Sequence, residues 1–220
     1  MNYAALVSAV SSYTENTFPT VDMNLFITQA EKRIYNTVQI PALRKNVTGI
    51  TTANNKYLAC PDDFLSSYSL AAIAPTTGAY SYLLNKDVNF IREAYPKPTS
   101  TGSPKYYALF GPAVASSVIT TELTFIIGPT PDAAYSMELH YYYYPESIVT
   151  ASTTWLSDNY DPVLLYGTLV EAYTYMKGET DMIALYDGKY KEAMGQLKRL
   201  GDGLERQDAY RSGQARVPVT

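Results

Sequence analysis

Few residues in this chain could support catalysis, and the first candidates are one histidine and one cysteine. A Ser-His-Asp arrangement would have to use His140, which is the only histidine. Cys60 is the only cysteine and directly precedes Pro61 at the end of a strand-like segment. A surface or structural histidine and a half-buried thiol explain both residues more simply. We therefore predict no catalytic residues, with a hydrolase that uses His140 as an alternative.

Two carboxylate pairs could in principle hold a divalent cation, Asp62 with Asp63 and Asp158 with Asp161. Acids in a turn and at the start of a helix explain the same residues without a metal. No motif indicates the paired carboxylates of a glycoside hydrolase. The sequence also lacks a P-loop, a G-x-G-x-x-G fingerprint and the spacing of zinc ligands. We therefore predict no metal, no cofactor and no enzymatic activity.

Tyrosine dominates the aromatic composition, with 22 residues in a chain of 220. The run from Tyr141 to Tyr144 could stack on sugars or bases, which makes a carbohydrate-binding module one alternative. Side chains alternate between the two faces of a strand, however, so at most two of these rings share a face. We predict that Tyr141 and Tyr143 fill a core on one face, and that the other face contributes to an interface, where tyrosine is favoured.

The composition indicates a folded protein with a substantial core. Hydrophobic residues make up 46% of the chain and charged residues 17%, which is unlike a disordered protein. The net charge of −4 argues against a chain whose whole surface binds nucleic acid electrostatically. No apolar run approaches about 18 residues, and the first four residues lack the basic start of a signal peptide. We therefore expect neither a membrane span nor secretion.

The segment 161–213 has the clearest helical pattern. Asp161-Pro162 combines an N-cap acid with a proline suited to the first turn, and Gly178 is suited to end that helix. The apolar face of this helix is predicted to contain Leu165, Leu169, Ala172 and Met176. A second helix carries apolar residues at alternating steps of three and four: Ile183, Tyr186, Tyr190, Ala193, Leu197, Leu200 and Leu204. Other helices must cover this seam.

Two more helices are predicted near the start of the chain, over residues 3–16 and from Asp22 to Pro41. From residue 43 to 155 the period changes to two, with turn residues between six or seven strand candidates. We therefore predict an α+β fold in which the N-terminal hairpin and the C-terminal helix pair form a four-helix bundle with an inserted antiparallel β module. The predicted boundaries are 1–42 and 156–211 for the bundle, 43–155 for the β-rich insertion, and 212–220 for a flexible C-terminal tail.

Four features of this sequence carry a resemblance to a known family. They are the N-terminal helical hairpin, the turn from Leu58 to Phe64, the segment from Trp155 to Tyr173, and Tyr190 with Leu197 in the last helix. In these features the chain resembles the bacteriophage head-to-tail adaptor (connector) family, which includes the T7-type tail tubular protein A. The resemblance covers nearly the whole chain.

The resemblance implies a structural virion protein in the neck, between head and tail. About twelve copies would form a ring that connects the portal protein to a tail nozzle or tail tube protein, with DNA passing through the lumen in transient, non-specific contact. The final helix and residues 205–220 would dock into the portal. The docking residues we expect are Arg206, Tyr210, Arg211, Gln214, Arg216 and Val217. Another tail structural or fibre-attachment protein, present in six or three copies, is the alternative.

Overall fold

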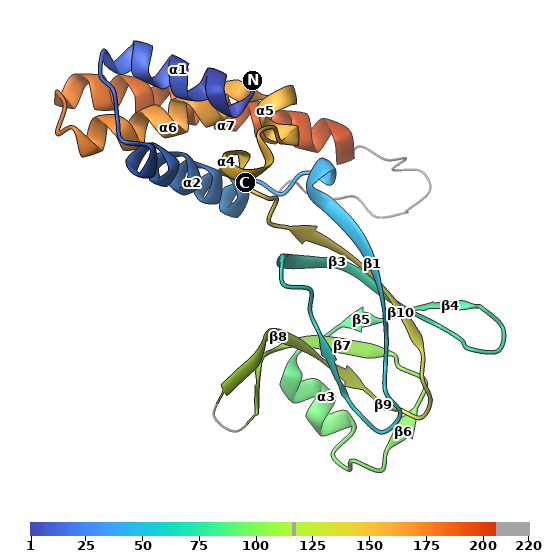
Figure 1. Ribbon diagram of the computed structural model, residues 1–220. Helices are drawn as coiled ribbons and strands as arrows, with labels where there is room; N and C mark the ends of the chain where they lie inside the picture. Colours follow the sequence, from blue (N-terminus) through green and yellow to red (C-terminus); the bar gives the residue numbers. More distant parts are fainter. Residues whose placement is uncertain (116–117, 206–220) are drawn as a thin grey trace. The chain divides into compact units, whose positions relative to one another are not determined.

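The computed structural model describes residues 1–115 and 118–205. The chain folds into two compact units (Figure 1). Residues 1–43 and 145–205 form the helical unit. Residues Arg44–Tyr144 form the β unit. No helix among the described residues is both long enough and apolar enough to cross a membrane.

The helical unit is arranged around one central helix. Its elements are α1 (Tyr3–Thr14), α2 (Thr20–Thr37), η1 (Pro41–Leu43), α4 (Ile148–Ala151), α5 (Trp155–Asn159), α6 (Asp161–Tyr175) and α7 (Thr180–Glu205). Helices α1, α2 and α7 each pack against α6. Helix α6 is buried on nearly every side, because its buried residues follow one another around the helix: Val163, Leu164, Gly167, Thr168, Leu169, Val170 and Ala172.

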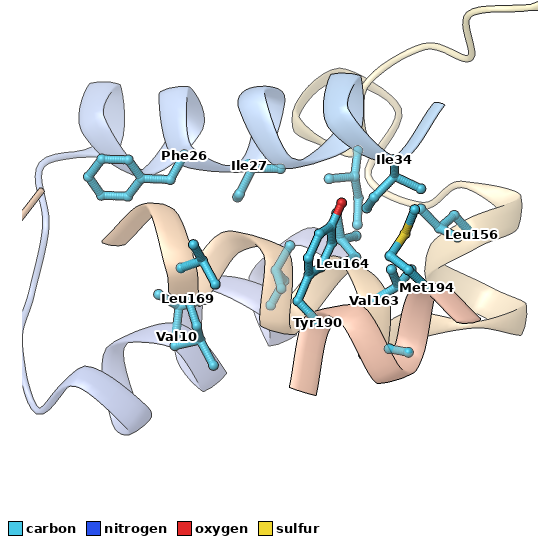
Figure 2. Packing of buried hydrophobic residues seen from close by; sticks show 14 of the residues in the cluster. Val10, Phe26, Ile27, Ile34, Leu156, Val163, Leu164, Leu169, Tyr190 and Met194 are labelled. Carbon is cyan, nitrogen blue, oxygen red and sulfur yellow. The ribbon is translucent and has the colours of Figure 1, made fainter. Parts of the chain in front are cut away.

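One hydrophobic cluster joins these helices (Figure 2). Val10 of α1 and Ile27 of α2 approach α6 from different sides, and Leu164 and Leu169 of α6 lie between them. All four side chains are fully buried. Burying an aliphatic side chain of this size contributes about 1.5–3 kcal/mol, so this cluster stabilises the association of distant segments of the chain.

The ends of α6 differ in detail from the predicted ones. Tyr160 occupies the N-cap position, and Asp161 with Pro162 forms the first turn, so Asp161 is inside the helix. At the other end Lys177 adopts the left-handed conformation, with φ 54°, one residue before the predicted Gly178. The backbone N–H of Gly178 donates to the Tyr173 carbonyl at 3.0 Å and so closes the helix end. A Cβ at Gly178 would meet the Tyr173 ring at 2.9 Å, which explains the glycine.

The apolar seam predicted for α7 is only partly buried. Tyr186, Tyr190, Ala193 and Leu197 are at most 8% exposed, whereas Leu200 is 39% and Leu204 is 47% exposed. The heptad spacing therefore identified the inward face of α7 but not the point at which other helices stop covering it.

The β unit contains two four-stranded sheets, a short strand pair and one helix (Figure 1). The first sheet has the order β1 (Arg44–Ile50), β10 (Ser136–Tyr143), β3 (Phe64–Ile73) and β4 (Tyr80–Tyr82). The second sheet has the order β2 (Tyr57–Ala59), β8 (Val118–Gly128), β7 (Tyr106–Ala115) and β5 (Leu84–Asn85). Strands β6 (Thr101–Gly102) and β9 (Thr130–Pro131) pair with each other, and α3 spans Val88–Ala94.

The core of the β unit lies between the two sheets. Leu70, Met137 and Tyr141 come from the first sheet and contact Tyr107 and Phe125 of the second. Met137, Leu139 and Tyr141 are buried and alternate with more exposed residues along β10, so Tyr141 fills the core as predicted. The other face of the second sheet is covered by α3, whose Ile91 is buried with Ala108 and Ile126.

The predicted fold class, a four-helix bundle with an inserted antiparallel β module, is wrong. The described residues form seven α-helices and two four-stranded sheets, and the strands are too extensive for an insertion in a helical fold. The β5–β7 and β6–β9 pairings are also parallel. In the helical unit, three helices pack on central α6. The amphipathic spacing predicted most of the inward-facing residues but did not specify which helix each face meets.

A buried carboxylate connects α2 to the start of α4. Glu31 is 3% exposed, and its Oε1 accepts the backbone N–H of Ile148 at 2.9 Å. Ile148 is the first residue of α4, where an N–H has no partner within its own helix. Burial raises the pKa of Glu31, an effect that the hydrogen bonds from Ile148 and Ser147 only partly offset.

Replacing Glu31 with alanine should lower the free energy of unfolding by about 1–3 kcal/mol, because the Ile148 N–H would be buried without an acceptor. Glutamine keeps an acceptor and should cost less. Because the folded-state pKa is raised, the folded protein holds the Glu31 proton more tightly than the unfolded chain. Wild-type stability should therefore fall as pH rises above about 4.5 through the folded pKa, and Glu31→Gln should remove that component. Denaturant unfolding over a pH series measures both effects, and identical pH profiles would contradict this assignment.

Candidate functional site

The structure places His140 on the outer face of the first sheet, away from the core. Its ring is 3.6 Å from Glu138, which lies two residues earlier in β10, and its side chain is 43% exposed. The same Glu138 carboxylate accepts the hydroxyl of Tyr80 at 3.2 Å. Among the residues that the structure describes, Glu138 is the one polar contact of His140. This arrangement is a surface contact between an imidazole and a carboxylate, and no serine in the described part of the chain is hydrogen-bonded to the ring.

Cys60, in contrast to His140, lies inside the core of the β unit. Its side chain is 6% exposed and belongs to the cluster that contains Phe64 and Phe125. Burial raises the pKa of the thiol to about 12. A thiol with so high a pKa is almost entirely protonated at neutral pH, so Cys60 is a packing residue and a poor nucleophile.

Asp63 of the first carboxylate pair is a tether between strands. Its two carboxylate oxygens accept Lys45 Nζ of β1 at 2.6 Å and the Tyr141 hydroxyl of β10 at 2.8 Å. Burial pulls the pKa of Asp63 upward, but the hydrogen bonds from Lys45 and Tyr141 outweigh it, and the pKa lies below its usual range. Because the ammonium group of Lys45 already binds the carboxylate, a divalent cation is not needed to neutralise it. Asp62 is exposed.

The second carboxylate pair is also separated into different roles. Asp158 in α5 accepts the hydroxyl of Ser157 at 3.4 Å, and Asp161 in α6 lies 3.9 Å from the N-terminal ammonium of Met1. No cluster of three or more histidine, cysteine, aspartate or glutamate side chains suited to a metal occurs within residues 1–115 and 118–205. The two carboxylates therefore belong to the local structure of the helix starts.

The tyrosine run divides between the core and a covered surface. Tyr141 is 3% exposed and stacks on Phe64 in the core. Tyr142 points to the other face but is also buried, because the guanidinium of Arg44 lies 4.9 Å from its ring. Arg44 also lies 3.9 Å from the centre of Tyr68. Tyr144 is 38% exposed. These rings do not form one flat stacking platform.

An exposed aromatic and basic cluster on the second sheet was not predicted. Tyr57 of β2 and Phe110 of β7 lie with their rings 5.4 Å apart, at 41% and 37% exposure. Lys56 and Arg92 lie 5.5 and 5.1 Å from these two rings, respectively. Cross-strand pairing through β8 brings the two strands together, and that pairing cannot be read from either strand alone. Aromatic and arginine side chains are enriched in protein interfaces, so this surface is suited to a protein contact.

The predicted docking residues lie outside the described residues. Arg206, Tyr210, Arg211, Gln214, Arg216 and Val217 all follow Glu205, where the description of α7 ends.

The comparisons with known proteins decide which family this fold belongs to. The family model described as SU10 adaptor protein matches residues 1–218, which include both units. The chain belongs to the SU10 adaptor protein family. No curated protein matches it.

As a member of the SU10 adaptor family, the chain is a phage adaptor, a structural protein of the virion that associates with other head or tail proteins. The predicted resemblance to phage adaptor proteins is therefore confirmed. The side chains considered above for catalysis act in this adaptor as core, tether and surface residues.

Asp63→Asn should lower the free energy of unfolding of this adaptor by about 1–2 kcal/mol near neutral pH, since the amide loses the charge that Lys45 and Tyr141 bind. The value allows for solvent screening, because Lys45 is about half exposed. Because the pKa of Asp63 is lowered in the folded protein, this stabilisation should be present above about pH 3.8. It should be lost as the pH falls through the folded-state pKa. Exposed Asp62→Asn is the matched control. Equal stability loss in both variants at pH 7 would show that Asp63 is not a specific tether.

Proposed function

We propose that about twelve copies of this adaptor form a ring in the virion neck, between the portal and a tail nozzle or tail tube protein. The observation that carries this proposal is the SU10 adaptor match over residues 1–218, which covers the helical unit and the β unit together. Such a ring is the arrangement that the T7-type resemblance implies. Its role is structural, and no step of it requires catalysis.

The surface of the β unit supports a protein with several protein contacts. The β unit exposes large aromatic side chains on both of its sheets, among them Tyr57, Tyr80 and Tyr82. A ring needs one patch of each subunit to bind a different patch of its neighbour, in addition to contacts with the structures above and below. In this proposal the β unit contacts the tail side.

The charge distribution suits a lumen that lets DNA pass. Within Arg44–Tyr144 the sequence has seven acidic and seven basic residues, and the whole chain has a net charge of −4. Tight, sequence-independent binding to DNA requires clustered lysine and arginine side chains that neutralise phosphates. Contact with DNA in the lumen is therefore transient and non-specific in this proposal.

Residues 205–220 are proposed to dock into the portal. This segment contains Arg206, Arg211 and Arg216 and, apart from Glu205 at the end of α7, only one acid, Asp208. The rest of the helical unit, residues 1–43 and 145–204, contains twelve acids and seven bases. The segment thus differs in charge from the unit that carries it, and an acidic groove in the portal would bind it selectively.

Deleting residues 205–220 should abolish portal binding and leave the thermal unfolding of the remaining chain unchanged. A double charge reversal, Arg211→Glu with Arg216→Glu, should weaken binding by at least about tenfold, which corresponds to about 1.4 kcal/mol. Co-sedimentation with purified portal of the same phage measures both effects.

The matched control reverses one exposed charge in the other unit, Lys105→Glu, and should bind the portal like the wild type. Wild-type portal binding by the truncated chain would show that docking uses another part of the adaptor.

A further inference from the structure

The outward face of α7 contains glycines that no contact with the described residues explains. Gly188 and Gly195 are one heptad apart, and a Cβ built on either would meet no atom within 4 Å. Gly201 is different, because a Cβ there would meet Ile40 at 2.4 Å. Glycine inside a helix costs about 1 kcal/mol relative to alanine, so two exposed glycines weaken α7 without improving its packing in this chain.

A groove adjoins this glycine face, between α2 and α7. It has a volume of about 330 Å³ and is lined by Arg33, Thr37, Tyr190, Lys191, Met194, Gly195 and Lys198. Gly195 therefore belongs both to the open face and to the groove. We call the two together the α7 groove.

The hydroxyl of Tyr190 lacks a hydrogen-bond partner in the α7 groove. Figure 2 shows the Tyr190 side chain extending from α7 toward α2. The residue is 6% exposed, and its hydroxyl oxygen is buried with no hydrogen-bond partner among the described residues. Its ring packs against Gly167 of α6, where a Cβ would approach the ring to 3.2 Å. A buried hydroxyl without a partner costs stability, which a ligand that accepts its hydrogen bond would recover.

The α7 groove is lined by basic residues, whereas the helical unit as a whole contains more acidic than basic residues. Arg33, Lys191 and Lys198 are three of the seven bases in residues 1–43 and 145–205, a region that also contains thirteen acids. Arg33 and Lys191 contact Glu171 and Asp187 of the same chain, whereas Lys198 forms no ion pair with any described residue. The rest of the helical unit contains thirteen acids, one of which is buried Glu31, and four bases. A second copy of this chain is therefore complementary in charge to the groove.

We propose that the α7 groove is the contact between neighbouring copies in the ring. An acidic helix surface of the second copy lies against Gly188 and Gly195, whose missing side chains let the two backbones approach closely. A carboxylate of that copy enters the groove and pairs with Lys198. The Tyr190 hydroxyl is buried in the single chain, and the side chain turns toward the groove to donate its hydrogen bond to this carboxylate. This inference rests on the proposed ring.

The test uses two substitutions that should weaken the assembly without destabilising the single chain. Gly195→Ala should raise the melting temperature by about 2–4 °C, since alanine favours the helix and the space above it is open in one copy. Tyr190→Phe should leave the melting temperature unchanged or slightly higher. Both should weaken ring formation by at least about tenfold, through overpacking in one case and a lost hydrogen bond in the other.

Ring formation is measured by native mass spectrometry of the full chain, alone and on purified portal of the same phage. Lys198→Glu should also prevent assembly. The matched control is Lys189→Glu, an equal charge change on an exposed α7 residue outside the groove, which should assemble normally.

Three results would overturn the inference. Normal rings from Gly195→Ala, Tyr190→Phe and Lys198→Glu would exclude the groove as the contact and leave the ring proposal intact. Intact rings that no longer bind the portal would assign the groove to the portal. A wild-type chain that forms no ring, alone or on the portal, would overturn the proposed function together with this inference.

Discussion

The helical unit depends on the burial of α6. This helix has apolar or small residues around nearly its whole circumference, so it is stable only when other helices surround it. Helices α1 and α2 come from the start of the chain and α7 from its end. In the sequence, the β unit lies between these two groups of helices. Glu31 connects α2 to α4, the first helix after the β unit.

Because α7 helps to bury α6, its two faces have different roles. Its inward face, with Tyr186, Ala193 and Leu197, is used to cover α6 and its neighbours. Its outward face is left for other molecules, and it holds the exposed glycines and the basic groove. In a structural adaptor of the SU10 family, such surfaces are expected to bind partner proteins. Asp63 instead tethers strands and Cys60 packs in the core.

Much of the local structure could be predicted from the sequence, because it depends on neighbours in the chain. The spacing of Leu165 and Leu169, or of Tyr186 and Tyr190, identifies helices directly, and the alternation of Met137, Leu139 and Tyr141 identifies a strand with one buried face. The role of Asp63 could not be predicted, because its partners lie 18 and 78 residues away in the sequence. The exposure of Leu200 and Leu204 was missed for a related reason, since periodicity does not show where the covering helices end.

The candidate site, likewise, could be predicted from the sequence only where it depends on local spacing. The glycines of α7 were visible in the sequence at heptad spacing, but only the structure shows that Gly201 contacts Ile40 while Gly188 and Gly195 face open space. The groove itself requires α2 and α7 to lie next to each other on α6, which no local pattern specifies. Family membership, by contrast, follows from the sequence over nearly its full length.

A cryo-EM reconstruction of the neck of the purified phage particle, refined with twelve-fold symmetry, tests the central claim most directly. We expect the helical unit and the β unit of this chain to fit the density of a ring directly below the portal, with α7 of each copy against its neighbour. A neck ring built from another protein, with this chain elsewhere in the particle or absent from it, would contradict the account.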